Sequence, residues 1–238
     1  MNNSLTLKIG GFNIKTVFNK SEKPFVRDTI KNEIIDFFKG FIIKNPNNKP
    51  DYTINFIEKK RMDLLYNGKG KKYYLGFFEE TGVNSMNAYY SINPLQFQTV
   101  INFILFKLSL KHETLFLKSI AIEKNGKAEI FFKDIENIHN KFLTDDISII
   151  KKENGRYYFY QSPFIENPFI EKNHGKFPIG NIYIPLKSKN ISEGKIEDKE
   201  QILENLAKKI SGDSKNYNSQ IKYLMEFVKN FDNFYYIK

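Results

Sequence analysis

The stretch "IFFKDIENIHNKFLTDDISII" (residues 130–150) gives the clearest indication of how the chain folds. Its apolar start predicts a strand, and the carboxylate pair Asp145–Asp146 opens a second apolar run about a dozen residues later. In phosphate-binding folds, two such strands commonly enclose a glycine-rich loop and a helix. The intervening residues, 133–144, contain no glycine. The frame of a nucleotide site is therefore present without its loop.

The segments around this stretch predict both strands and helices. Asn125–Gly126 and Asn154–Gly155 each separate two apolar runs, which is a strong hairpin signal. Asn93 and Pro94 suit the first turn of a helix over residues 94–111, whose wide apolar stripe places it in the core. Two amphipathic helices end the chain. Their apolar faces are formed by Ile202, Leu206 and Ile210 in one, and by Ile221, Leu224, Val228 and Phe231 in the other.

The first part of the chain, residues 1–92, is rich in short strand patterns. Gly10–Gly11 indicates a hairpin or bulge, and residues 25–38 have the spacing of a short helix. Gly68 and Gly70 precede a strand and are typical of a hairpin turn, a phosphate cradle being the alternative.

We expect this β-rich part to pack on the core formed by residues 93–238, so that the whole chain makes one compact unit. The predicted fold class is α+β. Its sheets should be mixed and largely antiparallel, with a central helix and two C-terminal helices.

The composition is that of a folded protein without cysteine chemistry. Of the 238 residues, 41% are apolar and 16% aromatic, which is enough to bury a sizeable core. Because cysteine is absent, disulfides, thiolate metal sites and cysteine nucleophiles are all excluded.

The net charge of +10 raises the question of nucleic-acid binding. Only three of the 37 basic residues are arginines, which nucleic-acid-binding proteins favour for bidentate contacts. The densest basic groups, "EKKRM" (58–62) and "GKGKK" (68–72), are short. An excess of Lys beside Asn, Ile, Phe and Tyr is typical of an AT-rich bacterial genome. We therefore expect a solvated basic surface, with an anion-binding face as the alternative.

The sequence gives no indication of a membrane protein. The most apolar stretch, "FQTVINFILFKLSL" (97–110), is too short and too often interrupted by polar residues to span a bilayer. The N-terminal residues, "MNNSLTLKIGGFNIK", lack the apolar core and cleavage site of a signal peptide. We expect a cytoplasmic protein that does not contact a membrane.

Three segments in order resemble the C-terminal catalytic domain of the HPr kinase/phosphorylase family, which is related to phosphoenolpyruvate carboxykinase. They are "LFLKSIAIEKNGKAEIFF" (115–132), "LTDDISIIKKENGRYYFYQSPF" (143–164) and "FPIGNIYIPLK" (177–187). In that family a hairpin leads into a phosphate loop ending in Gly-Lys-Ser/Thr, and an Asp-Asp pair opens a later strand. Asp145–Asp146 and Ser162–Pro163–Phe164 match the later positions. The resemblance covers about a third of the chain.

The departures from the family affect its chemistry. The family's loop binds phosphate through successive backbone N–H groups and one Lys. Residues 133–144 have no glycine, and Lys141 lacks the turn that would direct it to a phosphate. Lys118 stands where the family often has a His. Nucleotide binding in the family manner is therefore not expected, and residues 133–144 should form a short turn or a single helical turn.

Three functions follow from these observations. The first is a catalytically inactive HPr-kinase-like protein, acting as a binding or scaffolding module for an unknown protein or peptide partner, without a cofactor. The second is an ATP-dependent phosphotransferase with a non-standard nucleotide site and Mg²⁺. The third, a basic nucleic-acid-binding protein, explains the charge alone. We favour the first.

No catalytic, cofactor-binding or metal-binding residue is predicted under the favoured interpretation. The remnant catalytic candidates are Asp145, Asp146 and His139, and the candidates for holding a cofactor are Lys133 and Lys141. Asp145 and Asp146 are also the candidate metal ligands, although Mg²⁺ normally needs substrate phosphates beside such a pair. We expect the pair to be structural, with one carboxylate accepting hydrogen bonds from nearby backbone N–H groups.

The three histidines, His112, His139 and His174, lie in separate segments. None has a metal-ligand partner at i+3 or i+4, and structural zinc is therefore not expected. His112 is expected at a helix C-terminus, where a cation suits the helix dipole.

Overall fold

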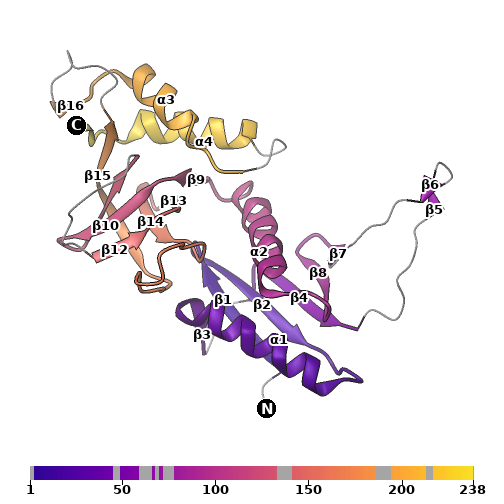
Figure 1. The fold of residues 1–238 in the computed structure, drawn as a ribbon. Coiled ribbons are helices and arrows are strands. Elements are labelled where there is room, and N and C mark those ends of the chain that lie inside the picture. Colours follow the sequence, from indigo (N-terminus) through magenta and orange to yellow (C-terminus); the bar gives the residue numbers. More distant parts are fainter. Residues whose placement is uncertain are drawn as a thin grey trace. The chain divides into compact units, whose positions relative to one another are not determined.

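The computed structural model describes residues 3–44, 49–58, 78–132, 141–185, 194–212 and 217–237, and only the backbone of 66–67 and 70–71. This part of the chain has the predicted mixed α+β fold, with both antiparallel and parallel strand pairs (Figure 1). None of its helices is both long enough and apolar enough to cross a membrane.

The chain divides into two compact units. The first unit comprises Met1–Lys8 and Phe12–Ile104, and the second comprises Ile9–Gly11 and Leu105–Lys238. The division falls inside helix α2 (Pro94–Ser109), whereas the sequence suggested one compact unit with a change of character at residue 93. The wide apolar stripe of α2 supplies core residues along its whole length, so its start does not mark a boundary.

The first unit is built on a six-stranded sheet with the order β3-β1-β2-β4-β8-β7. Its strands are β1 (Ser4–Ile9), β2 (Phe12–Phe18), β3 (Ile42–Ile43), β4 (Tyr52–Ile57), β7 (Phe78–Gly82) and β8 (Ser85–Tyr89). Strands β2, β4 and β8 run parallel. Helix α1 (Pro24–Phe37) and a 3₁₀ turn η1 (Lys39–Phe41) connect β2 to β4, and parallel neighbours require such a crossover.

A separate pair of short strands, β5 (Tyr66–Asn67) and β6 (Gly70–Lys71), pairs antiparallel. This pairing agrees with the hairpin predicted around Gly68 and Gly70, although Gly68 itself lies outside the described residues.

The core of the first unit joins α2 to one face of this sheet. Alternate residues of β2 and β4 are buried, and the rings of Phe18 and Phe56 stack 4.9 Å apart. The ring centroid of Phe97 in α2 lies 5.6 Å from that of Phe56 and 5.6 Å from that of Phe38, the residue after α1. The predicted helix over residues 94–111 is thus present, packs on a sheet, and ends at Ser109.

The start of α2 has the cap that Asn93 predicted. The Asn93 side chain accepts the N–H of Gln96 at 2.8 Å, and the Gln96 side chain accepts the N–H of Asn93 at 2.9 Å. This reciprocal arrangement is a capping box, and it satisfies backbone donors that the first helical turn leaves free.

The second unit contains a nine-stranded sheet, with the main path β12-β10-β11-β15-β14-β13-β9. Its strands are β9 (Thr114–Lys118), β10 (Ile120–Lys124), β11 (Lys127–Phe131), β12 (Lys141–Thr144), β13 (Ile147–Glu153), β14 (Arg156–Gln161), β15 (Lys176–Pro185), β16 (Gly194–Lys195) and β17 (Phe234–Ile237). Most neighbours pair antiparallel, and β15 pairs parallel with β11 and β17.

Both Asn-Gly hairpins form as predicted. Asn125 and Gly126 have φ of 53° and 73° between β10 and β11, and Asn154 and Gly155 have φ of 49° and 77° between β13 and β14. Two successive positive φ angles define the turn that best matches the twist of paired strands, and Asn-Gly adopts them at least cost.

The core of the second unit lies between its sheet and two helices, α3 (Lys199–Ala207) and α4 (Tyr217–Asn230). These are the two C-terminal helices that the sequence predicted. The face of α4 centres on Phe227, a fully buried residue outside the predicted stripe, whose ring packs 4.7 Å from Tyr157 and 5.9 Å from Phe234. Ile210 lies beyond the end of α3 and forms a bridge with Leu117 instead.

Candidate functional site

Asp145 lies between β12 and β13, where its carboxylate binds the backbone of a distant loop. Its Oδ1 accepts the N–H of Glu166 at 3.1 Å, and its Oδ2 accepts the N–H of Asn167 at 2.6 Å. Both N–H groups belong to residues 162–175, the segment between β14 and β15, which we call the Phe169 loop. The carboxylate therefore fixes this loop against the start of β13.

Asp146 has a different environment. Its backbone carbonyl accepts the N–H of Ser119 at 2.8 Å, which joins the β9–β10 connection to the start of β13. Burial raises the pKa of the half-buried Asp146 carboxyl; Lys118 opposes this shift, and the carboxylate of Glu166 adds to it. The two neighbouring aspartates thus differ, since one binds backbone N–H groups and the other is partly desolvated.

Lys141, a predicted cofactor candidate, lies on β12. Its ammonium is 3.4 Å from the carboxylate of Glu171 and 3.9 Å from that of Glu123, in a half-exposed position. The other two sequence candidates near the pair, Lys133 and His139, lie outside the described residues. Within the described ranges, no three His, Asp or Glu side chains are placed to hold a metal ion together.

The expectation of a short turn over residues 133–144 is wrong for its last part. Residues Lys141–Thr144 form β12, which pairs with β10 at Ile122 and Ala121, and the preceding residues 133–140 lie outside the described part. The apolar residues Phe142 and Leu143 form too short a run to identify a strand from sequence, since pairing with β10 supplies most of the stability of β12.

The other histidines lie apart from this region. α2 ends at Ser109, and His112 sits in the following turn, where its N–H donates to the Ser109 carbonyl at 3.2 Å. His174 is exposed in the Phe169 loop.

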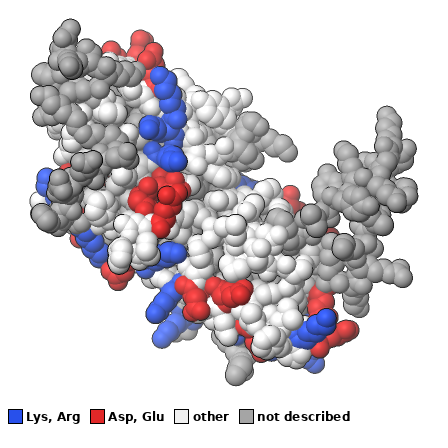
Figure 2. Space-filling view, in the orientation of Figure 1, with Lys and Arg blue, Asp and Glu red and all other residues white. Residues whose placement is uncertain are grey.

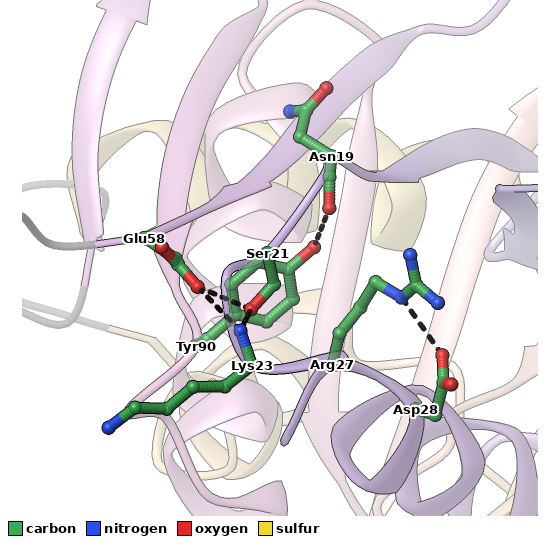
Figure 3. Close-up of polar contacts among 7 residues, drawn as sticks. All are labelled: Asn19, Ser21, Lys23, Arg27, Asp28, Glu58 and Tyr90. Carbon is green, nitrogen blue, oxygen red and sulfur yellow. Dashed lines mark hydrogen bonds and ion pairs between the residues drawn. The ribbon is translucent and has the colours of Figure 1, made fainter. Parts of the chain in front are cut away.

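A second polar cluster, which the sequence did not indicate, lies before α1 in the first unit (Figure 3). The Ser21 hydroxyl donates a hydrogen bond to the Glu58 carboxylate, and the N–H of Lys23 contacts Ser21 Oγ at 3.0 Å and Glu58 Oε1 at 3.3 Å. The Tyr90 hydroxyl donates to the carbonyl of Asn19 at 2.6 Å. The hydrogen bond from Ser21 lowers the pKa of Glu58, and burial opposes this.

A pocket of about 660 Å³ adjoins this cluster. Its lining residues are Ser21, Glu22, Lys23, Val26, Glu58, Tyr90 and Ser91. The serine is a donor to a carboxylate, and no histidine lines the pocket to act as the base that an activated serine needs. These contacts join the end of β4 to the segment before α1, and they are best explained as a structural clamp.

A groove of about 850 Å³ lies on the second unit, between α3 and α4. We call it the α3–α4 groove. It is lined by Lys111, Glu113, Lys199, Glu200, Leu203, Lys222, Tyr223, Met225, Glu226, Val228 and Lys229. Its apolar lining includes Met225, whose side chain is 54% exposed, and Leu203 of α3. An exposed methionine in a hydrophobic groove is typical of surfaces that bind peptides.

The charges of the groove are only partly paired. Lys199 contacts Asp232 at 2.7 Å, and Glu226 contacts Lys152 at 3.6 Å. Lys222 and Lys229 flank Met225 on the same face of α4, and neither pairs with a carboxylate of the described residues. The groove therefore combines an apolar lining with the two lysines of α4, and the carboxylates of Glu113 and Glu200 also line it.

Basic side chains of the described residues occur in small groups on the visible face of the surface (Figure 2). On the face drawn in Figure 2, they alternate with acidic and uncharged residues. This distribution differs from the continuous basic stripe that follows a nucleic-acid backbone.

Comparison with models of known protein families gives no match, and comparison with curated proteins gives none either. The structure therefore defines the class of the protein by its own features: a mixed α+β chain of two units, with a loop fixed by a carboxylate and a peptide-sized groove.

Proposed function

We propose that this protein is a catalytically inactive, HPr-kinase-like protein that acts as a binding or scaffolding module for a protein or peptide partner. The observation that carries the proposal is the bonding of Asp145. Both of its carboxylate oxygens accept backbone N–H groups of the Phe169 loop, at 3.1 and 2.6 Å. The residue that resembles a catalytic aspartate is engaged in holding a surface loop.

Phosphoryl transfer requires several groups that act together: a backbone cradle, a Lys or Arg clamp and metal ligands. Lys141 is beside Glu171 and Glu123, and Asp146 is partly desolvated, which favours its neutral form. These positions give little support to a metal–phosphate site around the pair.

The surface features support binding. The fixed loop presents Phe169 with 93% of its side chain exposed, and the α3–α4 groove offers apolar lining between two cations. Large exposed apolar side chains on ordered elements are common centres of protein interfaces.

The proposal is tested by thermal unfolding with and without Mg·ATP. A ligand at 100 times its dissociation constant adds about 2.7 kcal/mol to the free energy of unfolding, which raises the melting temperature by roughly 5–11 °C for a chain of this size. We expect that Mg·ATP does not shift the melting temperature of the wild-type protein or that of the Asp145→Asn/Asp146→Asn variant. A shift in the wild type that this variant loses would contradict the proposal and favour an ATP-dependent phosphotransferase.

A further inference from the structure

We propose that the protein associates with further copies of itself head to tail, with the Phe169 loop of one copy seated in the α3–α4 groove of the next. This inference rests on the proposed function as a binding module and names the partner of the groove. Three observations carry it: a preorganised apolar side chain, a groove with complementary charges, and a separation that prevents both from meeting within one chain.

The Phe169 loop is ordered by its own hydrogen bonds. The Asn167 side chain accepts the N–H of Phe169 at 3.0 Å, and the Asn167 carbonyl accepts the N–H of Ile170 at 3.2 Å. The Gln161 side chain donates to the Glu171 carbonyl at 2.9 Å. Ile170 is buried, whereas Phe169, its neighbour, is 93% exposed. A loop whose backbone is already held in place loses little entropy on binding.

The groove matches a ligand that carries an aromatic ring with a carboxylate on either side of it. Lys222 and Lys229 are seven residues apart on α4, which places them about 10 Å apart along the helix. Met225 lies between them, and Leu203 of α3 lines the same groove. A ligand with an apolar side chain flanked by two negative charges would use both parts of this surface.

Phe169 has such flanking charges. Glu166 and Glu171 lie three residues before and two residues after it, and both are exposed. Glu171 is paired with Lys141 at 3.4 Å, but its side chain is 73% exposed, and surface pairs of this kind are weak enough to exchange.

A second highly exposed aromatic residue in the described part of the chain, Phe25, is a poorer match. Phe25 is 82% exposed, but Lys23 and Arg27 balance the carboxylates of Glu22 and Asp28, and Arg27 is paired with Asp28 at 2.9 Å. The surroundings of Phe25 therefore carry no excess of negative charge for the lysines of the groove.

The loop and the groove of one chain lie at opposite ends of the β13–β14 hairpin. The groove meets the turn end, where Lys152 and Tyr157 contact Glu226 of α4. The loop is fixed at the other end, by Asp145 and Gln161. β13 (Ile147–Glu153) spans about 20 Å between these ends. The contact must therefore form between two copies. Because the two surfaces in contact differ, each assembly keeps a free loop at one end and a free groove at the other, and further copies bind in succession.

Sedimentation velocity from roughly 10 µM to 1 mM tests the proposal, since weak specific association has dissociation constants in this range. We expect the wild-type protein to grow beyond a dimer as concentration rises. Phe169→Asp and Met225→Glu should each weaken association by roughly 30-fold or more, the effect of a central interface residue. Because both side chains are exposed, both variants should keep the wild-type melting temperature. Phe25→Asp is the matched control and should associate like the wild type.

Mixing the two variants is the decisive step. The Phe169→Asp copy keeps an intact groove and the Met225→Glu copy keeps an intact loop, so an equimolar mixture should form a dimer that neither variant forms alone. Raised salt should weaken it. A wild type that stays monomeric at 1 mM, variants that associate normally, or a mixture that stays monomeric would each overturn the proposal. If the protein does not self-associate and does not respond to Mg·ATP, the proposed function stands and only the head-to-tail assembly is overturned. If the protein assembles head to tail and also turns over ATP, only the proposed function is overturned.

Discussion

The Asp145 carboxylate accepts the N–H of Asn167 at 2.6 Å across a separation of 22 residues in the chain. Together with its bond to the N–H of Glu166, this contact makes Asp145 the support of the Phe169 loop. Hydrogen bonds to a charged acceptor are about twice as strong as neutral ones. Asp145 is thereby connected to the proposed interaction surface.

Replacing Asp145 by Ala should release the loop. We expect a loss of about 1–3 kcal/mol in the free energy of unfolding, because two backbone donors lose a charged acceptor. The amides of Glu166 and Asn167 should exchange with solvent faster, as measured by hydrogen exchange. Asp146→Asn is the control and should leave these two amides protected. Unchanged exchange in Asp145→Ala would show that other contacts hold the loop.

Asp146 should lower the free energy of unfolding when its carboxyl is ionised, whereas Asp145 should raise it. Burial raises the pKa of its folded-state carboxyl above the unfolded value, with Lys118 opposing the shift. As pH rises from about 4, the unfolded state therefore releases this proton first, and stability falls until the folded carboxyl has also ionised. Asp146→Asn removes this loss. The variant should melt at the wild-type temperature near pH 3 and above it at pH 7. A lower melting temperature at pH 7 would indicate that the electrostatic attraction of Lys118 for the Asp146 carboxylate dominates.

Two buried serines should respond differently to replacement by Ala. The Ser148 hydroxyl accepts the hydroxyl of Ser119 at 2.7 Å, whereas Ser162 Oγ, fully buried, has no hydrogen-bond partner among the described residues. A buried polar group without a partner costs free energy. Ser162→Ala should therefore raise the free energy of unfolding by about 1 kcal/mol, and Ser148→Ala should lower it by a similar amount. Chemical denaturation measures both, and a loss of stability in Ser162→Ala would reveal a missing partner.

Gln220 of α4 is expected to be a major polar contributor to the second unit. Its side chain is fully buried, accepts the N–H of Phe116 at 3.0 Å and donates to the carbonyl of Thr114 at 2.8 Å, both on β9. Gln220→Leu removes the partner of the Phe116 N–H and of the Thr114 carbonyl. We expect the free energy of unfolding to fall by about 2–4 kcal/mol, as measured by thermal denaturation. Asn218→Leu, at an exposed position of the same helix, is the control and should change stability little.

Local sequence signals account for much of the fold. The Asn-Gly pairs at 125–126 and 154–155 determine their own turns, since the required positive φ angles suit these residues. Asn93 and Gln96 identify the start of α2 in the same way, because a capping box acts within four residues. The strand β12 was not foreseen, because it depends on pairing with β10.

The candidate sites depend on contacts between distant segments. Ser21 and Glu58 are 37 residues apart, and Asp145 is 21 residues from Glu166, so no spacing rule connects them. The sequence indicated that one carboxylate of the Asp145–Asp146 pair would accept nearby backbone N–H groups, but not that the donors would belong to a distant loop. The α3–α4 groove was missed because Met225 falls on the polar side of the apolar stripe and was not assigned to any surface.

The central claim, that the protein does not transfer phosphate and that Asp145 and Asp146 are structural, is tested most directly by ATP turnover. The assay compares the wild-type protein with Asp145→Asn/Asp146→Asn under the same Mg·ATP concentration. We predict that both proteins show only the background rate of ATP hydrolysis, and that the double variant remains folded. ATP turnover by the wild type that is lost in the double variant would contradict the account.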